Sequence, residues 1–371
     1  MTESYSPGLE GIVAGETAVS TVETGLTYRG YTIEDLGANS NYEEVAYLVL
    51  HGELPTATEA AAFRERLGAA AFVPPEVLQT LRSIPAAAST MDVLRSAASL
   101  LAHWEPEVND NSHAANVRKT ERLIAKMPVI VAARQRLKSG QDVIAADRQL
   151  PLPANFLWML RGEKPSERQT KALDVSMILY AEHEFNASAF SARCVVSTLS
   201  DLHSGITAAI GALKGPLHGG ANERAMEVLQ EVGSADQAES WIRSALANKR
   251  RIMGFGHRVY KDGDPRAVYL KTLTAEVAKE TGNDELERTA DIIESVVRNE
   301  KKLPPNVDWP CARLYHYLGL PIDLYTPLFV VARVVGWAAH IIEQLDNNRL
   351  IRPRAIYNGV AERKWRPVSE R

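Results

Sequence analysis

A repeat of apolar residues every three to four positions runs through almost the whole chain and restricts its fold more than any other feature. This period predicts helices over residues 42–50, 57–71, 90–104, 116–137, 167–184, 221–232, 235–247, 268–280, 284–297 and 327–345. Only residues 11–33, where Thr and Val nearly alternate after an early Gly, suggest short strands. The sequence therefore predicts an all-α protein.

Two of the predicted helices, residues 187–213 and 326–345, are apolar on nearly every face. A helix that is apolar all round is buried all round, either in a large core or in a subunit interface, and both explanations stay open. Arg193 and Asp201 interrupt the first segment and Arg333 the second, so neither offers the ~20 uninterrupted apolar residues that span a bilayer. We expect a soluble protein with no membrane contact.

The length, charge and cysteine content of the chain restrict the class of protein further. At ~150 residues per domain, 371 residues predict two domains. The chain has 42 Lys and Arg against 46 Asp and Glu, and a net charge of −4 argues against a general nucleic-acid binder. Its two cysteines, Cys194 and Cys311, make neither a disulfide framework nor a cysteine zinc site. Since the N-terminal segment reads as neither a secretory signal nor a transit peptide, we expect a cytoplasmic protein.

One histidine, His218, lies between Gly215-Pro216 and Gly219-Gly220, directly before the predicted helix at 221–232. Glycines on both sides remove side-chain bulk, so the imidazole and nearby backbone N–H groups can approach a ligand at a helix N-terminus. The alternative is a simple turn in which the histidine has no role.

A second histidine, His257, follows Gly254 and Gly256 in a segment rich in cations. The six cations are Lys249, Arg250, Arg251, Arg258, Lys261 and Arg266. The segment has neither a dinucleotide fingerprint nor a Walker A sequence. Local cations in an acidic protein indicate an anion ligand, and the alternative is a solvated basic loop.

A third candidate, Asp308, stands in a proline-rich turn beside Val307 and Trp309. Apolar neighbours raise the pKa of a carboxylate, which suits a general base acting on a weak carbon acid. The alternative is a helix N-cap for a helix over 311–318.

Two arginines and one further histidine complete the candidates. Arg333 lies in an apolar helix, and because a buried guanidinium without an anion is costly, its partner is either distant in sequence or a ligand. Arg352 is a similar case near the C-terminus. His183 is not part of an HExxH motif, so no metal site is predicted. Together these groups fit acid–base carbon chemistry on a polycarboxylate.

The motifs that carry this chemistry resemble those of the citrate synthase family, in order and over nearly the whole chain. They are Gly8-Leu9-Glu10-Gly11, Tyr28-Arg29-Gly30-Tyr31, the His-Glu-x-Asn at 183–186, GPLHGGANE at 215–223, GFGHRVYK at 254–261 with Asp264-Pro265-Arg266, Asn306-Val307-Asp308, and Asn348-Arg349-Leu350-Ile351-Arg352-Pro353. The chain lacks the β-rich N-terminal extension of the large, NADH-inhibited bacterial form. It is therefore similar to the short dimeric type.

The resemblance implies a two-domain helical fold, with a large domain of residues 1–219 and 320–371 and a small domain of residues 220–319. It implies a homodimer whose cleft closes over oxaloacetate before acetyl-CoA binds. Asp308 would take a proton from the acetyl methyl group while His218 donates a hydrogen bond to the thioester carbonyl. His257 would polarise the ketone of oxaloacetate, and citryl-CoA would then be hydrolysed. The CoA thioester is a substrate, and no cofactor is expected.

The resemblance also implies two sets of binding residues. The oxaloacetate ligands would be His183, His257, Arg266, Arg333 and, from the other subunit, Arg352. The CoA contacts would be Lys261, Arg250, Arg251 and Lys214.

Two alternatives stay open. A 2-methylcitrate synthase uses propionyl-CoA with the same residues, and its pocket differs by room for one methyl group, worth about 1–3 kcal/mol. A non-catalytic helical dimerisation scaffold would keep the fold alone. The joint presence of His218, His257 and Asp308 disfavours the scaffold.

Overall fold

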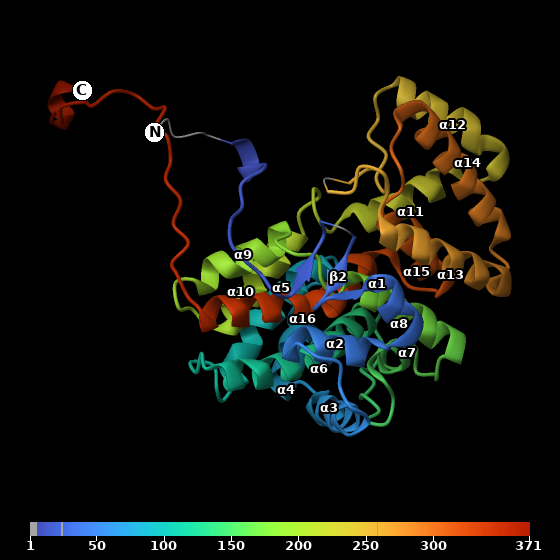
Figure 1. The fold of residues 1–371 in the computed structure, drawn as a ribbon, viewed down its shortest axis with the longest axis horizontal. Helices are drawn as coiled ribbons and strands as arrows, with labels where there is room; N and C mark the ends of the chain where they lie inside the picture. Colours follow the sequence, from blue (N-terminus) through green and yellow to red (C-terminus); the bar gives the residue numbers. More distant parts are fainter. Residues whose placement is uncertain (1–5, 24, 258) are drawn as a thin grey trace.

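The computed structural model describes residues 6–23, 25–257 and 259–371 of the chain, and helices dominate it (Figure 1). The α-helices of this part are α1 (Ile33–Asn39), α2 (Tyr42–His51), α3 (Ala57–Ala70), α4 (Pro75–Ser83), α5 (Thr90–Leu101), α6 (His113–Lys138), α7 (Leu152–Arg161), α8 (Glu167–Tyr180), α9 (Ala187–Val196), α10 (Leu202–Leu213), α11 (Ala221–Val232), α12 (Ala235–Ala247), α13 (Pro265–Thr281), α14 (Asp284–Lys301), α15 (Asp308–Tyr317) and α16 (Tyr325–Asp346). Short 3₁₀ turns lie at Pro7–Leu9, Ala102–Trp104, Ile322–Leu324 and Val368–Glu370. The prediction of an all-α protein is confirmed.

The ends of α8 show how local chemistry sets the boundaries. Ser166 caps its N-terminus by accepting the N–H of Gln169, whose side chain in turn accepts the N–H of Ser166. The helix ends at Tyr180, earlier than the predicted residue 184. The residues that follow leave the helix and carry His183 into the interior.

Residues 187–213 do not form one helix, and that prediction is wrong. The chain breaks between α9 and α10, where Leu199 adopts a φ of 68° and the Asp201 side chain caps α10 by accepting the N–H of Ser204. An aspartate that caps a new helix is a start signal that the apolar period hides.

The short strands expected within residues 11–33 are present as β1 (Ser20–Thr21), β2 (Thr27–Tyr28) and β3 (Tyr31–Thr32). They form one antiparallel sheet in the order β1-β2-β3, with Ser20 opposite Tyr28. The buried hydroxyl of Tyr28 donates to the carbonyl oxygens of Ile178 (3.0 Å) and Glu182 (3.1 Å). The sheet therefore fixes the segment that follows α8.

Helix α16 runs through the centre of the larger group of helices and packs against α2, α6, α8, α9 and α10 (Figure 1). The helical stretch Ile322–Asp346 is long and apolar enough to cross a membrane by length and composition alone. However, 83% of its most apolar window is buried inside the protein. It is the core helix of the fold, as its all-round apolar surface predicts.

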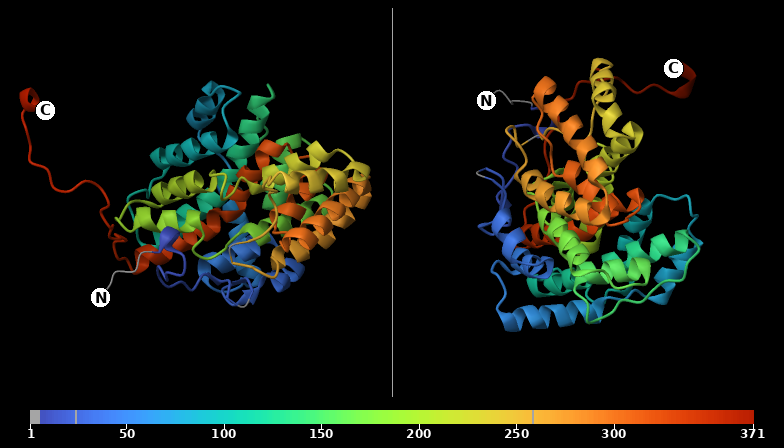
Figure 2. Two further views of the ribbon diagram at one scale, coloured as in Figure 1. Left: turned by 90° about the horizontal axis from the view of Figure 1, so that it is seen from above. Right: turned by 90° about the vertical axis from the view of Figure 1, so that its right-hand side faces the viewer.

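Helices α11 to α15 form a second, smaller group beside the first (Figures 1 and 2). Within it α12 packs against α14 and α13 against α15, and it meets the larger group mainly where α13 contacts α8 and α11 contacts α16. The fold is therefore all-α with two domains, while the boundaries at 219/220 and 319/320 stay a prediction. Residues 347–371 leave the larger group as an extended segment (Figure 1).

Candidate active site

The candidate residues from five separate segments gather where the two groups of helices meet. They are His183 after α8, His218 before α11, His257 in the loop before α13 with Arg266 at the start of that helix, Asp308 at the start of α15, and Arg333 within α16. The rings of His183 and His257 are 5.2 Å apart. The Phe329 ring lies close to both Arg333 and His218. The centre of this ring is 4.4 Å from the guanidinium carbon of Arg333 and 6.5 Å from the centre of the His218 ring.

Asp308 is the first residue of α15, and its carboxylate does not cap the helix, so the N-cap alternative is wrong. Its backbone N–H donates to Oδ1 of Asn306 at 3.0 Å, and its own Oδ1 accepts the hydroxyl of Tyr180 at 2.6 Å. Burial raises the pKa of Asp308 to about 6. A carboxylate with that pKa is ionised at neutral pH and basic enough to accept a proton from carbon.

His218 contacts Ser188, whose Oγ lies 2.8 Å from Nε2 and accepts the indole N–H of Trp337 at 3.0 Å. Oγ of Ser188 also donates to Oδ1 of Asn186 at 2.6 Å, so its single proton does not decide which ring nitrogen of His218 carries the proton. Burial and the charge of Arg333 lower the pKa of His218 to about 4. This histidine is a neutral hydrogen-bond donor at physiological pH.

His257 has its tautomer set by the backbone. Its Nδ1 accepts the N–H groups of Val259 (3.1 Å) and Tyr260 (3.3 Å), so the proton lies on Nε2. Burial and the charge of Arg266 lower the pKa of His257 to about 4. The ring is a second neutral donor, and it stacks on Tyr260 with 4.7 Å between centres.

Two buried groups in this site have hydrogen-bonding atoms left over. Nε2 of His183 and Nη2 of Arg333 have no hydrogen-bond partner among the residues that the structure describes. Nε of Arg333 donates to the carbonyl oxygen of Tyr180 at 2.9 Å, so a partner distant in sequence accounts for part of its bonding. Burial lowers the pKa of Arg333 to about 10, which leaves it a cation. Unpaired buried donors are costly unless a ligand satisfies them.

Arg266 is held rigidly by Asp264 through two hydrogen bonds, Nε to Oδ1 at 3.0 Å and Nη2 to Oδ2 at 2.9 Å. Oδ2 of Asp264 also accepts the backbone N–H of Val307 at 3.0 Å. One buried carboxylate therefore ties Arg266 to the turn that carries Asp308.

The predicted basic segment lines a pocket of about 560 Å³ that His257 shares. Its lining includes Lys249, Arg250, Arg251, Phe255, His257 and Lys301. Arg250 also pairs with Glu231 at 2.6 Å and lies over the ring of Trp241. Arg258 lies outside the described residues.

The three other residues predicted to bind substrate, Lys261, Lys214 and Arg352, are all exposed. Lys261 is exposed, and its charge contributes to the lowered pKa of His257. Lys214 is exposed at the end of α10 and pairs with Asp92 at 2.7 Å. Arg352 is exposed on the extended C-terminal segment. The structure therefore does not bring Lys214 or Arg352 into this chain's cluster.

The sequence analysis assigned no role to four residues of the site: Tyr180, Ser188, Asp264, and Asn222, whose Nδ2 donates to the hydroxyl of Tyr180. Asp264 precedes Pro265 at the start of α13, and an Asp-Pro helix start could have singled it out. Tyr180 and Ser188 carry no such signal, because they lie within helical runs of ordinary core composition.

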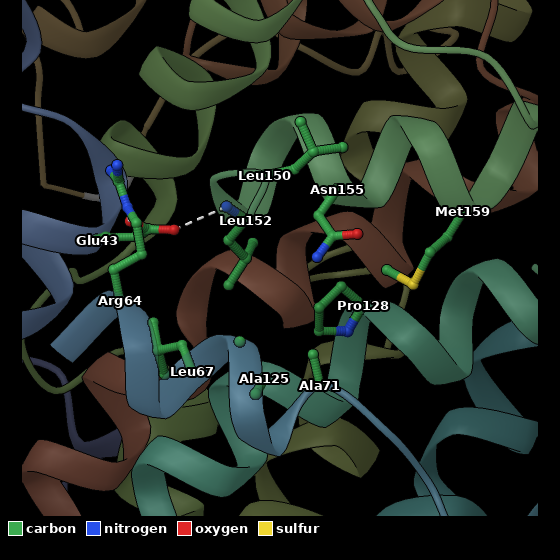
Figure 3. Close-up of a pocket in the computed structure, with 11 residues that line it drawn as sticks. Glu43, Arg64, Leu67, Ala71, Ala125, Pro128, Leu150, Leu152, Asn155 and Met159 are labelled. Atoms are coloured by element: carbon green, nitrogen blue, oxygen red, sulfur yellow. Dashed lines mark hydrogen bonds and ion pairs between the residues drawn. The ribbon is translucent and has the colours of Figure 1, made fainter. Parts of the chain in front are cut away.

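A second cavity lies between α2, α3, α6 and α7 (Figure 3). Its volume of about 20 Å³ is enough for one water molecule. The side chains around it are mostly apolar, and Glu43 already accepts the N–H of Leu152 at 2.8 Å. This cavity is a packing gap and not a substrate site.

Comparisons with known proteins agree with this geometry. The family described as "Citrate synthase, C-terminal domain" matches residues 8–354. Citrate synthase 2 of Bacillus subtilis is 48% identical over 366 residues, with 98% of each chain covered. The 2-methylcitrate synthase of Shewanella oneidensis is 45% identical, with 98% of this chain and 97% of that protein covered.

A solved structure extends the likeness to three dimensions. Citrate synthase from Thermoplasma acidophilum, in a ternary complex with carboxymethyl coenzyme A and oxaloacetate, superposes with a TM-score of 0.94 at 34% identity over all of both chains. The chain belongs to the citrate synthase family. It is an enzyme, an acyltransferase of this type.

Proposed function

We propose that this enzyme condenses acetyl-CoA with oxaloacetate to give citrate and CoA. The observation that carries the proposal is the combination of one carboxylate base, Asp308, with two neutral imidazole donors, His218 and His257. A free thiol on each of Cys194 and Cys311 suits a reducing cytoplasm, where we expect the reaction to run.

In the first step Asp308 takes a proton from the acetyl methyl group. The C–H bond breaks, its electron pair forms the enol, and the charge that develops on the thioester oxygen is met by the N–H of His218. A donor already in place as charge develops lowers the barrier, since it needs no reorganisation.

In the second step the enol carbon attacks the ketone of oxaloacetate, and Nε2–H of His257 polarises that ketone and supplies the proton. The carboxylates of oxaloacetate meet Arg266, Arg333 and His183, and the unpaired Nη2 donor of Arg333 favours an anion. Water then hydrolyses citryl-CoA to citrate and CoA.

We assign CoA to the 560 Å³ pocket, where Arg250 and Arg251 would meet its phosphates. Lys261, which follows His257 in the chain and is exposed, stays part of the assignment. Lys214 remains part of the assignment, although its ion pair with Asp92 would have to break.

We propose a large domain of residues 1–219 and 320–371 and a small domain of residues 220–319. The site lies between them, so oxaloacetate binding would draw them together.

We further propose a homodimer in which Arg352 completes the partner's site. Helices α9 and α10 leave small residues such as Ala187 and Ala208 only partly covered within one chain. The extended C-terminal segment exposes Tyr357 and Trp365, 77% and 78% of whose surfaces are accessible. Large exposed apolar groups of this kind indicate a protein contact.

Mixing two inactive variants tests this proposal. In a heterodimer of Arg352→Ala with Asp308→Asn, one site has an intact Asp308 and the partner's intact Arg352. We expect mixing under exchange conditions to restore about a quarter of wild-type sites, by statistical pairing of the C₂ dimer. No recovery, or a sedimentation coefficient of an active monomer, would refute the shared site.

The choice of acyl group is tested by thiol release with oxaloacetate and either acetyl-CoA or propionyl-CoA. We expect kcat/KM for acetyl-CoA to be higher by about 10- to 200-fold, the discrimination that one methylene allows. A higher value for propionyl-CoA would identify a 2-methylcitrate synthase. No thiol release with either substrate would leave the scaffold alternative.

A further inference from the structure

We propose that Tyr180 is the positioning residue of the base: its hydroxyl holds one oxygen of Asp308, so that the other oxygen faces the acyl carbon. The proposal rests on the proposed function, because it concerns the same proton-transfer step. It adds a residue from α8 to a base that belongs to α15.

The geometry is a chain of three buried polar side chains. Nδ2 of Asn222 donates to Oη of Tyr180 at 3.1 Å, and Oη donates to Oδ1 of Asp308 at 2.6 Å. Tyr180 and Asn222 are 1% and 2% exposed. Because a tyrosine hydroxyl has one proton, donation by Asn222 leaves Tyr180 to point its proton at Asp308. Hydrogen bonds in such a chain strengthen one another.

The backbone of Asp308 does not by itself aim the carboxylate. Asn306 and Asp264 hold the N–H groups of Asp308 and Val307, which fix the start of α15 but leave the side-chain torsions open. Tyr180 is the residue whose hydrogen bond to the carboxylate the described structure shows. A carboxylate held at one oxygen presents the other in a fixed direction, and proton abstraction depends on that direction.

The same bond sets the acidity of the base. Burial and the charge of Asp264 favour the protonated form of Asp308, whereas the Tyr180 hydrogen bond and the charges of Arg266 and Arg333 favour the carboxylate. Two more titratable groups of α15, Cys311 and Tyr315, are also electrostatically coupled to Asp308. All of them except Tyr180 are unchanged in a Tyr180→Phe variant, so the comparison isolates the hydroxyl.

The test is the pH profile of kcat/KM for acetyl-CoA at saturating oxaloacetate. The wild-type profile should rise with pH through about 6, where Asp308 ionises. In Tyr180→Phe we expect this limb to move up by about one pH unit, because a charge-assisted hydrogen bond is lost. The plateau should fall about tenfold from the loss of orientation, with the KM for oxaloacetate nearly unchanged.

Tyr315→Phe is the matched control. Tyr315 is also a buried tyrosine beside this site, but its hydroxyl bonds to Ser176 at 3.3 Å and does not touch the carboxylate. Its acid limb should stay at the wild-type pH. If Tyr180→Phe folds poorly, Asn222→Ala removes the far end of the chain and should shift the limb in the same direction by less.

The outcomes separate this inference from the proposed function. A limb that shifts in Tyr180→Phe but not in Tyr315→Phe supports the positioning role. A limb that stays in place, or that shifts equally in both variants, overturns it while leaving the function standing. A wild-type enzyme that releases no thiol from any acyl-CoA would instead overturn the proposed function.

Discussion

Replacing Asp308 with Asn should lower kcat for citrate formation by about 10²- to 10⁴-fold, the usual contribution of a general base. Asparagine keeps the shape and can still accept the Tyr180 hydroxyl at its carbonyl oxygen, but it cannot take a proton from carbon. Oxaloacetate affinity, measured by calorimetry, should change less than about threefold, because only a step after binding is lost.

A matched control for this variant is Asp284→Asn. Asp284 is also the first residue of a helix, α14, but it is exposed and outside the site. We expect it to keep wild-type turnover. If Asp308→Asn lost oxaloacetate affinity and turnover equally, Asp308 would be a structural residue and the assigned base would be wrong.

Replacing Arg333 with Gln should raise the KM for oxaloacetate by on the order of 10²- to 10³-fold, since truncating one partner of a buried charge pair costs about 2–5 kcal/mol. The KM for acetyl-CoA at saturating oxaloacetate should change little. The reason is the unpaired Nη2 of Arg333, a buried donor whose partner we take to be a substrate carboxylate.

Hydrogen exchange gives a second readout of the same variant. In the wild type, oxaloacetate alone should protect residues 250–266, because it bridges Arg333 of one proposed domain and Arg266 of the other. Arg333→Gln should lose this protection.

Arg134→Gln controls for the loss of any buried cation. Arg134 donates to backbone carbonyls such as that of Pro85 at 2.7 Å, so its loss should lower stability without changing the oxaloacetate KM.

In the hydrogen-exchange experiment, protection of residues 250–266 by acetyl-CoA alone, with none by oxaloacetate, would contradict the ordered closure.

The sequence predicted the helical class, most helix positions and the candidate residues that cluster in the structure. These predictions rest on periodicity and on glycines and prolines, which act locally. The sequence did not predict the break between α9 and α10, because the apolar pattern continues across residues 197–201. The break is seen only in the structure, where the Asp201 side chain caps α10.

The partners of the catalytic candidates could not be predicted, for a different physical reason. Tyr180 and Asp308 are 128 positions apart, and Ser188 and His218 are 30 apart. Their contacts depend on how α15 packs against α8 and on how α8 and α9 pack against α16, and no local pattern encodes that packing. The resemblance to a family supplied the roles of the candidates, whereas the tautomer of His257 came from its hydrogen bonds.

Because the histidines of the site have low pKa values, acidification should affect substrate binding and the chemical step differently. The pKa values of His218 and His257 are lowered to about 4 and that of His183 falls below its ordinary value. The positive charge for the proposed dicarboxylate therefore comes from guanidinium groups, those of Arg266, Arg333 and Arg352 of the partner subunit, which stay ionised at physiological pH. The binding of the substrate would then depend little on pH near neutrality. The rate of the reaction would depend on it, because the carboxylate that receives the carbon-bound proton has a pKa of about 6. Acidification towards pH 6 would then leave the substrate bound and slow the proton abstraction by Asp308, and the rate would recover when the pH rises again.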